Sequence, residues 1–78
     1  MTERRIAPRA EVLQSAKILF CAAEIPCTIR NLSATGACLI VETTLGIPPL
    51  FQLARPNQVP VTCKVRWRRP TTIGVIFR

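Results

Sequence analysis

The stretch Val59-Pro-Val-Thr-Cys-Lys-Val-Arg-Trp67 decides the fold, because apolar and polar side chains alternate along it. Its odd-numbered positions are all apolar, and its even-numbered positions from 62 to 66 are polar. This period of two is typical of a β-strand that turns one face to a core and the other to solvent. The stretch therefore predicts a strand over residues 59–67 whose core-facing row ends at Trp67.

Apolar runs elsewhere in the chain predict five more strands. Four of them cover residues 25–31, 37–42, 50–54 and 72–77. In the first and last of these four, we expect the apolar odd-numbered side chains to face the core. Apolar and polar residues alternate less cleanly over residues 12–23, so the pattern there allows a helix as well as a strand. The run Lys17-Ile-Leu-Phe-Cys21 favours a strand. Six short strands at spacings of about 8–12 residues predict an all-β fold, either a small barrel or a sandwich.

The size and charge of the chain indicate one small domain with an anionic ligand. Its 78 residues, 49% of them hydrophobic, are sufficient for a compact core. The formal net charge is +7, and nine of the eleven basic residues are arginine. Arginine favours planar, bidentate partners such as phosphate and the Hoogsteen edge of guanine. The alternative is that the charge only keeps a small protein soluble.

The residue types of the chain argue against an enzyme. It lacks histidine, tyrosine and aspartate, and its four acidic residues are scattered glutamates. No pair of them resembles a general acid and base, and no activating base accompanies Ser33 or the cysteines. The three glycines are isolated, so there is no glycine-rich phosphate loop. We therefore expect binding rather than catalysis, with no metal and no cofactor.

Cysteine usage favours a reducing compartment. The chain has four cysteines and no CxxC pair: Cys21, Cys27, Cys38 and Cys63. Two disulfides would fit a secreted protein, but no apolar signal-peptide segment follows the charged N-terminus. We expect free, partly buried thiols in a cytoplasmic protein. The longest apolar run, residues 18–23, is shorter than the about 20 residues that a spanning helix needs, so we expect no membrane insertion.

Two polar clusters are candidates for a binding site. Arg4, Arg5 and Arg9 fall in a segment of low apolar content, which we expect to be a flexible arm. The sequence Asn31-Leu-Ser-Ala-Thr-Gly36 offers an amide, a hydroxyl and a glycine that can take positive φ. Taken singly, the first cluster would be a solvated tail and the second ordinary turn chemistry. Their joint occurrence on a β scaffold favours a site.

At both clusters the chain resembles PilZ domains. Arg5 and Arg9 match the RxxxR motif of that family, with Arg4 as the frequent extra upstream arginine. Residues 31–36 match the [D/N]xSxxG motif in its asparagine form. The tail is similar too, in Val65-Arg-Trp and in Gly-Val-Ile-Phe77. The resemblance covers essentially the whole chain. Either motif alone is degenerate, but the two together, on a chain of six predicted strands, are specific to the family.

The resemblance implies an architecture and a ligand. The fold would be a six-stranded antiparallel β-barrel of the split-barrel type, with a flexible basic arm at residues 1–10 and the barrel at 11–78. The ligand would be cyclic di-GMP, which carries phosphates and guanine Hoogsteen acceptors that suit arginine. The context would be second-messenger signalling in a bacterium.

The resemblance also assigns roles to residues. In the family, the RxxxR arm wraps over the ligand, so Arg5 and Arg9 would clamp the dinucleotide with Arg4 assisting. Asn31 and Ser33 would hydrogen-bond a guanine or a phosphate.

Five further residues near the motifs also receive roles, and for four of them a structural alternative is open. Gly36 would leave room for a base. Trp67 would pack beside the ligand, although its strand pattern favours burial in the core. The side chains of Arg66, Arg68 and Arg69 would add positive potential, or else form an exposed hydrophilic face.

We therefore expect a non-enzymatic receptor that signals to an effector protein when cyclic di-GMP orders its arm. We expect a monomer rather than a dimer, and no binding of nucleic acid polymers. One alternative is a ligand-independent PilZ-like protein–protein adaptor. Another is a small basic barrel that binds single-stranded nucleic acid. Such barrels need surface aromatics, whereas the four aromatic residues here all fall in core-like strand patterns.

Overall fold

The computed structural model describes residues 10–78, so Arg4, Arg5 and Arg9 lie outside the described part. That part contains six strands and no helix, and hence none that could cross a membrane. The strands are β1 (Ala10–Phe20), β2 (Ala23–Leu32), β3 (Gly36–Ile40), β4 (Leu50–Ala54), β5 (Val61–Arg68) and β6 (Thr72–Phe77).

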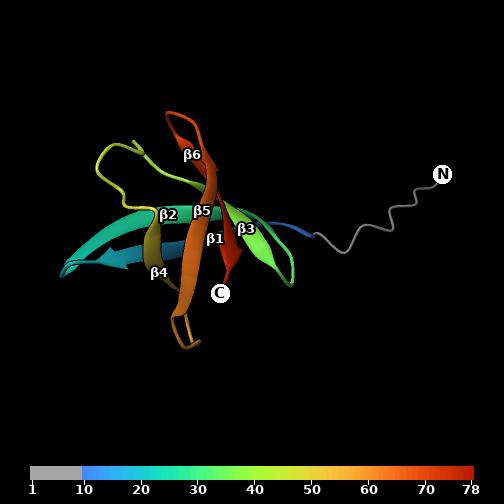
Figure 1. The fold of residues 1–78 in the computed structure, drawn as a ribbon. Helices are drawn as coiled ribbons and strands as arrows, with labels where there is room; N and C mark the ends of the chain where they lie inside the picture. The colour runs from blue at the N-terminus through green and yellow to red at the C-terminus, as the bar shows by residue number, and fades with distance from the viewer. Residues whose placement is uncertain (1–9) are drawn as a thin grey trace.

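All strand pairs are antiparallel, and the strands close into a barrel in the order β1-β2-β3-β6-β5-β4 (Figure 1). The predicted all-β class and the six-stranded antiparallel barrel are therefore confirmed. Residues 12–23, whose sequence pattern allows either a helix or a strand, form most of β1 and the tight turn into β2.

Every strand contributes to one core. The apolar odd-numbered residues of β2 and β6 face inward as predicted. The largest fully buried side chains come one from each strand: Ile18, Ile29, Leu39, Leu53, Cys63 and Ile73. Fully burying a side chain such as leucine or isoleucine stabilises the fold by about 1.5–3 kcal/mol. The core therefore depends on closure of the whole barrel.

The strand pairing has three register shifts, and two of them, in β5 and in β2, decide which face the residues of the site occupy. In β5, Val65 lies opposite Val75 but Trp67 lies opposite Gly74, so Arg66 is an extra residue in the strand. A bulge of this kind reverses the alternation beyond it. Trp67 is consequently turned outward and is 43% exposed, so the prediction that it lies in the core is wrong.

A second bulge lies in β2. Ile29 lies opposite Leu39 and Asn31 lies opposite Cys38, which makes Arg30 the extra residue. Asn31 therefore joins Cys38 on the outer face of the barrel, next to the buried Leu39 row. Without the bulge, the inward row of Ile29 would continue through Asn31.

The predicted start of β5 was also wrong. Val59 is 84% exposed and precedes the strand, which begins at Val61. Its neighbours explain this, because pairing with β4 begins at Leu53 opposite Val61, and pairing with β6 begins at Phe77 opposite Cys63. No strand of residues 10–78 lies opposite Val59, so its backbone is not paired into the described sheet.

The β1–β2 hairpin extends past the sheet on its β3 side. Pairing between β2 and β3 begins only at Thr28, so residues 23–27 are paired on one side alone. Pro26 lies on this stretch, opposite Lys17. Phe20 and Ala23 are the pair next to the turn, and Pro26 with Lys17 is three pairs farther along. In an antiparallel hairpin, pairs whose backbone groups point toward each other alternate with pairs whose groups point away. The nitrogen of Pro26 is therefore directed to the open edge. Proline is tolerated there because its missing N–H would have no partner.

Arg68 holds the loop between β3 and β4. Its Nη1 donates hydrogen bonds to the carbonyl oxygens of Thr44 and Ile47, at 3.1 and 2.8 Å. The backbone N–H groups of Val41 and Thr44 also bond to the β5–β6 turn. Arg68 is thus a structural residue, and the sequence-based expectation that it adds charge to the site is not met.

The turn between β1 and β2 is strained. Cys21 and Ala22 connect the two strands with φ values of 46° and 64°. Positive φ at both central residues is the geometry of the two-residue hairpin turn that favours Asn-Gly. Neither residue here is glycine or asparagine, so the chain carries local backbone strain at this turn.

Replacing Ala22 with glycine should stabilise the barrel. The left-handed conformation costs a non-glycine residue about 1–2 kcal/mol, of which the greater freedom of glycine in the unfolded chain cancels about 0.4–1 kcal/mol. We expect the melting temperature to rise by a few degrees in thermal unfolding followed by circular dichroism. The control is Ala34→Gly, at an exposed turn alanine without positive φ, which should lower it. An equal fall of the melting temperature in both variants would contradict the assignment of backbone strain to Ala22.

The four cysteines are free thiols, and two of them lie in the core. Burial raises the pKa of Cys27 from 9.0 to about 11, and the neighbouring Cys63 adds to the rise. Burial also raises the pKa of Cys63 to about 11, although Arg55 opposes the rise. Both thiols therefore remain neutral in the folded protein at pH values where an exposed thiol ionises.

Stability should fall as the pH rises from about 9 to 11. Over this range the two thiols ionise in the unfolded chain but not in the folded one, so the unfolded state loses more protons and is favoured. In melting temperatures measured against pH, the fall should be shallower for Cys27→Ala and Cys63→Ala. Ser15→Ala, which changes an exposed residue without an ionisable group, should keep the wild-type slope. One slope common to all the variants would refute the assignment.

Candidate ligand-binding site

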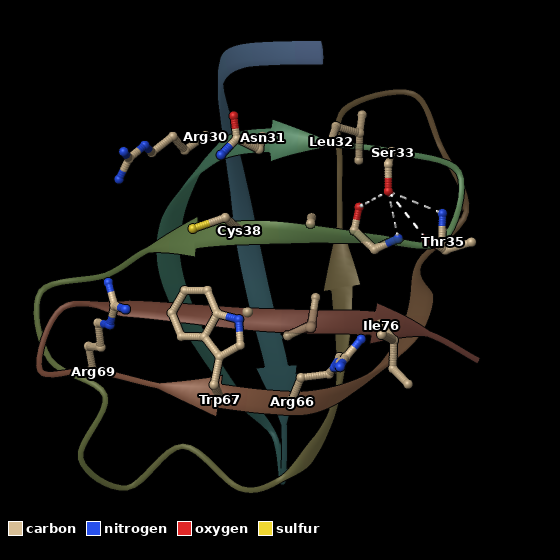
Figure 2. Close-up of a pocket in the computed structure, with 14 residues that line it drawn as sticks. Arg30, Asn31, Leu32, Ser33, Thr35, Cys38, Arg66, Trp67, Arg69 and Ile76 are labelled. Carbon is tan, nitrogen blue, oxygen red and sulfur yellow. Dashed lines mark hydrogen bonds between the residues drawn. The ribbon is translucent and has the colours of Figure 1, made fainter. Parts of the chain in front are cut away.

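A hollow of about 550 Å³ opens on the outer surface of the barrel, over β2, β3, β5 and β6 (Figure 2). This volume falls within the roughly 300–1,000 Å³ typical of small-ligand pockets. Six of the residues singled out from the sequence line it, namely Asn31, Ser33, Gly36, Arg66, Trp67 and Arg69. The structure thus brings Trp67 together with the 31–36 motif, although the two are far apart in the chain.

A row of four residues crosses the floor of the hollow. Asn31 lies opposite Cys38, Cys38 opposite Gly74, and Gly74 opposite Trp67, on the adjacent strands β2, β3, β6 and β5. Both ends of the row depend on a bulge, since the extra residues Arg30 and Arg66 turn Asn31 and Trp67 outward. The floor is therefore a product of the two register shifts.

Asn31 is the free polar group of the motif. Its side chain is half-buried at the wall of the hollow, and its amide has no hydrogen-bond partner within residues 13–78. An amide can donate and accept at once, so it is suited to the edge of a base or to a phosphate oxygen.

The hydroxyl group of Ser33 already makes hydrogen bonds within the turn that begins at this residue. Its Oγ accepts hydrogen bonds from the N–H groups of Thr35 and Gly36, at 3.3 and 3.2 Å. Its backbone N–H donates to the carbonyl oxygen of Gly36 at 2.9 Å. This is a serine turn of the kind that the turn interpretation of the motif describes. Ser33 therefore shapes the rim of the hollow whether or not it also contacts a ligand.

Gly36 is a glycine for a reason other than the one expected. Its φ is not positive, whereas that of Gly46, in the β3–β4 loop, is 84°. A side chain at Gly36 would overlap the carbonyl oxygen of Val75 on the neighbouring strand. The residue thus permits β3 and β6 to approach closely beside the hollow.

The indole of Trp67 lies directly on Gly74. A Cβ at Gly74 would overlap the ring, with Cζ2 at only 2.6 Å. Figure 2 shows the indole seated above β6, with Arg66 and Arg69 on its two sides. The guanidinium carbon of Arg69 is 5.2 Å from the ring centre, which is a cation–π distance. Trp67 is fixed by these contacts at the hollow rather than in the core.

Three arginines give the hollow a positive charge: Arg30, Arg66 and Arg69. The ion pair found within residues 13–78 joins Lys17 to Glu24, away from the hollow, so no carboxylate in that range neutralises the three guanidiniums. Sequence reasoning did not single out Arg30, because its place in the hollow depends on the bulge in which it is the extra residue. The sequence contains no clear signal for that bulge.

Comparison with known proteins identifies one family. A family model described as PilZ domain matches residues 3–78, essentially the whole chain. No curated protein and no solved structure gives a significant match. The matched range includes both arginines of the RxxxR motif as well as the residues of the hollow.

Ser33→Ala should lower the stability of the fold by about 1 kcal/mol, because two turn N–H groups lose their acceptor. Urea unfolding measures this difference. Ser15→Ala is the matched control, since Ser15 is exposed on β1 and its hydroxyl makes no hydrogen bond within residues 13–78. If the two variants were equally stable, the turn would not depend on the Ser33 hydroxyl.

Proposed function

Because this chain belongs to the PilZ domain family, we propose that it is a receptor for cyclic di-GMP. The family consists of receptor and adaptor domains, and the hollow has the chemistry that such a ligand requires. A cyclic dinucleotide of guanine presents two phosphates and two base edges, which suit guanidinium and amide groups. Arg30, Arg66 and Arg69 supply the former and Asn31 the latter.

The observation that carries this proposal is the position of the N-terminal end of β1. Ala10 lies opposite Leu32, and Leu32 lines the hollow. The segment that carries the RxxxR arginines therefore joins the barrel beside the hollow. Arg9 immediately precedes Ala10, and Arg5 is five residues away, a chain length that spans at most roughly 17 Å. Both arginines are thus within reach of a ligand in the hollow.

We assign the roles accordingly. Arg5 and Arg9 clamp the dinucleotide from the arm, and Arg4 assists them. Asn31 hydrogen-bonds a guanine or a phosphate with its free amide. Ser33 contributes mainly by holding the rim in shape, because its hydroxyl already bonds within the turn.

Binding of cyclic di-GMP would change the surface that the protein presents to other proteins. The arm orders over the ligand, and the ordered arm presents a new face to an effector protein. The entropy lost by the arm reduces the net affinity, so the response depends on several charge-assisted contacts forming together. Four free thiols fit a reducing compartment such as the bacterial cytoplasm.

Arg5→Ala and Arg9→Ala should each abolish measurable binding of cyclic di-GMP and leave the melting temperature unchanged. Each variant loses hydrogen bonds to a charged group, worth about 1.5–3 kcal/mol apiece. Isothermal calorimetry measures the affinity, with Lys17→Ala as a charge-matched control outside the hollow. Wild-type affinity in both arginine variants would exclude the arm from the site. No heat with the wild-type protein would instead favour a ligand-independent adaptor.

One observation favours a second candidate, binding of single-stranded nucleic acid. Trp67 is exposed rather than buried, so a surface aromatic does lie among the arginines of the hollow. Such binding uses stacked bases and a basic groove, and it weakens steeply with salt. Oligonucleotide binding that cyclic di-GMP does not compete away would support this candidate over the proposed receptor.

A further inference from the structure

A second hollow lies on a different part of the barrel from the first. Figure 1 shows the β1–β2 hairpin passing beside β4 and projecting beyond it. The second hollow, of about 640 Å³, lies between the tip of this hairpin and the start of β4. It shares no lining residue with the first hollow. Apart from Cys21, Glu24 and Gln52, all its lining residues are alanine, leucine, phenylalanine or proline, so it suits an apolar group rather than a phosphate.

The second hollow opens at the point where β1 separates from β4. Their pairing ends with Leu19 opposite Gln52, and the chain then enters the turn at Cys21. The strand β4 begins before Gln52, and its first residues, Leu50 and Phe51, pair with β5 on their other side. Within the described residues, the edge of β4 that faces β1 is therefore open over its first two residues.

The backbone of Leu50 is directed to this open edge. The carbonyl oxygen of Pro49 accepts a hydrogen bond from the N–H of Val65 at 2.8 Å, so the backbone at residue 49 faces β5. Backbone groups of successive residues in a strand point to opposite sides. The N–H and C=O of Leu50 therefore point toward β1, where the pairing has already ended. They are a donor and an acceptor for the main chain of an added segment.

The charge left uncompensated beside the second hollow is positive. Glu24 is the one charged residue that lines it, and its Oε1 already accepts a hydrogen bond from Lys17 at 3.4 Å. Lys64 lies opposite Leu50 on β5, is exposed, and has no carboxylate at ion-pair distance within residues 13–78. Leu50 is itself 49% exposed. A partner that covers Leu50 therefore meets an unpaired ammonium group, which an acidic side chain would complement.

We propose that the second hollow and the open edge at Leu50 form a docking surface for an extended, acidic segment of another protein. The segment bonds its main chain to the N–H and C=O of Leu50, inserts one apolar side chain into the hollow and places a carboxylate near Lys64. In strand addition of this kind, main-chain hydrogen bonds supply affinity and side-chain pockets supply specificity. The surface lies outside the proposed ligand site, so docking goes beyond the receptor function and can be tested without cyclic di-GMP.

Peptide selection tests the chemistry of the partner. The probe is a library of random heptapeptides displayed on phage and selected on the full-length protein. Enriched sequences should carry a large apolar residue close in sequence to an aspartate or a glutamate. Synthetic copies that carry a fluorophore then give the affinity by fluorescence anisotropy. A selection that enriches no sequence of this kind would overturn the proposal.

Two pairs of matched variants locate the peptides on the barrel. Leu50→Asp should weaken their binding about tenfold, because it removes an apolar contact and repels an acidic segment. Leu45→Asp, at an exposed loop leucine outside the second hollow, should have no effect. Lys64→Glu should weaken binding about fivefold through charge reversal, whereas Arg78→Glu, at an exposed cation outside both hollows, should not. Equal affinities of Leu50→Asp and Leu45→Asp would overturn the docking surface.

The amide of Leu50 reports the main-chain contact directly. In amide NMR spectra, its hydrogen exchange with solvent should slow about tenfold when a selected peptide binds, since an oxygen of the peptide then accepts from it. The amide of Leu45 already donates to Oγ1 of Thr43 and should not change. Peptide binding that leaves the exchange of Leu50 unchanged would overturn the strand-like pairing.

The outcomes are separable from those for the receptor. Leu50→Asp should bind cyclic di-GMP in calorimetry with wild-type affinity, because Leu50 does not line the first hollow. A wild-type protein that binds the peptides but not cyclic di-GMP would overturn the receptor alone, and the reverse result would overturn the docking surface alone. Concentration-dependent dimerisation that Leu50→Asp abolishes would assign the surface to a second copy of the chain, which would also overturn the proposal.

Discussion

The alternation of side chains between the two faces of a closed sheet is the constraint on which this structure depends. Each of the six strands places one large side chain fully in the core. Closure of the barrel therefore decides, for nearly every strand residue, whether its side chain points to the core or to the outer surface. The candidate site arises where the alternation is interrupted. Arg30 and Arg66 each add one residue to a strand, and each extra residue turns its neighbour outward. A site for a polar ligand is thereby built on a barrel without removing anything from its core.

Local pattern predicted the regular parts of the fold well. The bounds of β4 and β6 match the expected strands, because proline, glycine and clear alternation delimit them. The errors at Val59 and Trp67 have a non-local cause, since each depends on which residues lie opposite in neighbouring strands. For the same reason the role of Arg68 could not be read from its own strand, because its partners are loop carbonyls more than twenty positions away. The arm arginines lie outside the described residues, and their role remains a prediction.

The 31–36 motif proves to be largely structural in this chain. Ser33 organises the turn, and Gly36 allows β3 to approach β6. Only the amide of Asn31 is left without a partner within residues 13–78. Two of the three signature residues therefore have a structural role in the barrel besides the ligand contacts that we propose for the motif. Asn31 and the arginines of the hollow do not belong to the core of the described residues, which accords with the binding role that we propose for them.

The hairpin of β1 and β2 projects beyond β3 and leaves one edge of residues 23–27 unpaired. An open edge is a template on which a second copy of a chain can add a strand, and this can continue into aggregates. Pro26 supplies no N–H to such a strand, and its ring obstructs close approach. Pro26 thus removes one of the N–H groups that an added strand would need, which makes this open edge a poorer template for a second copy of the chain.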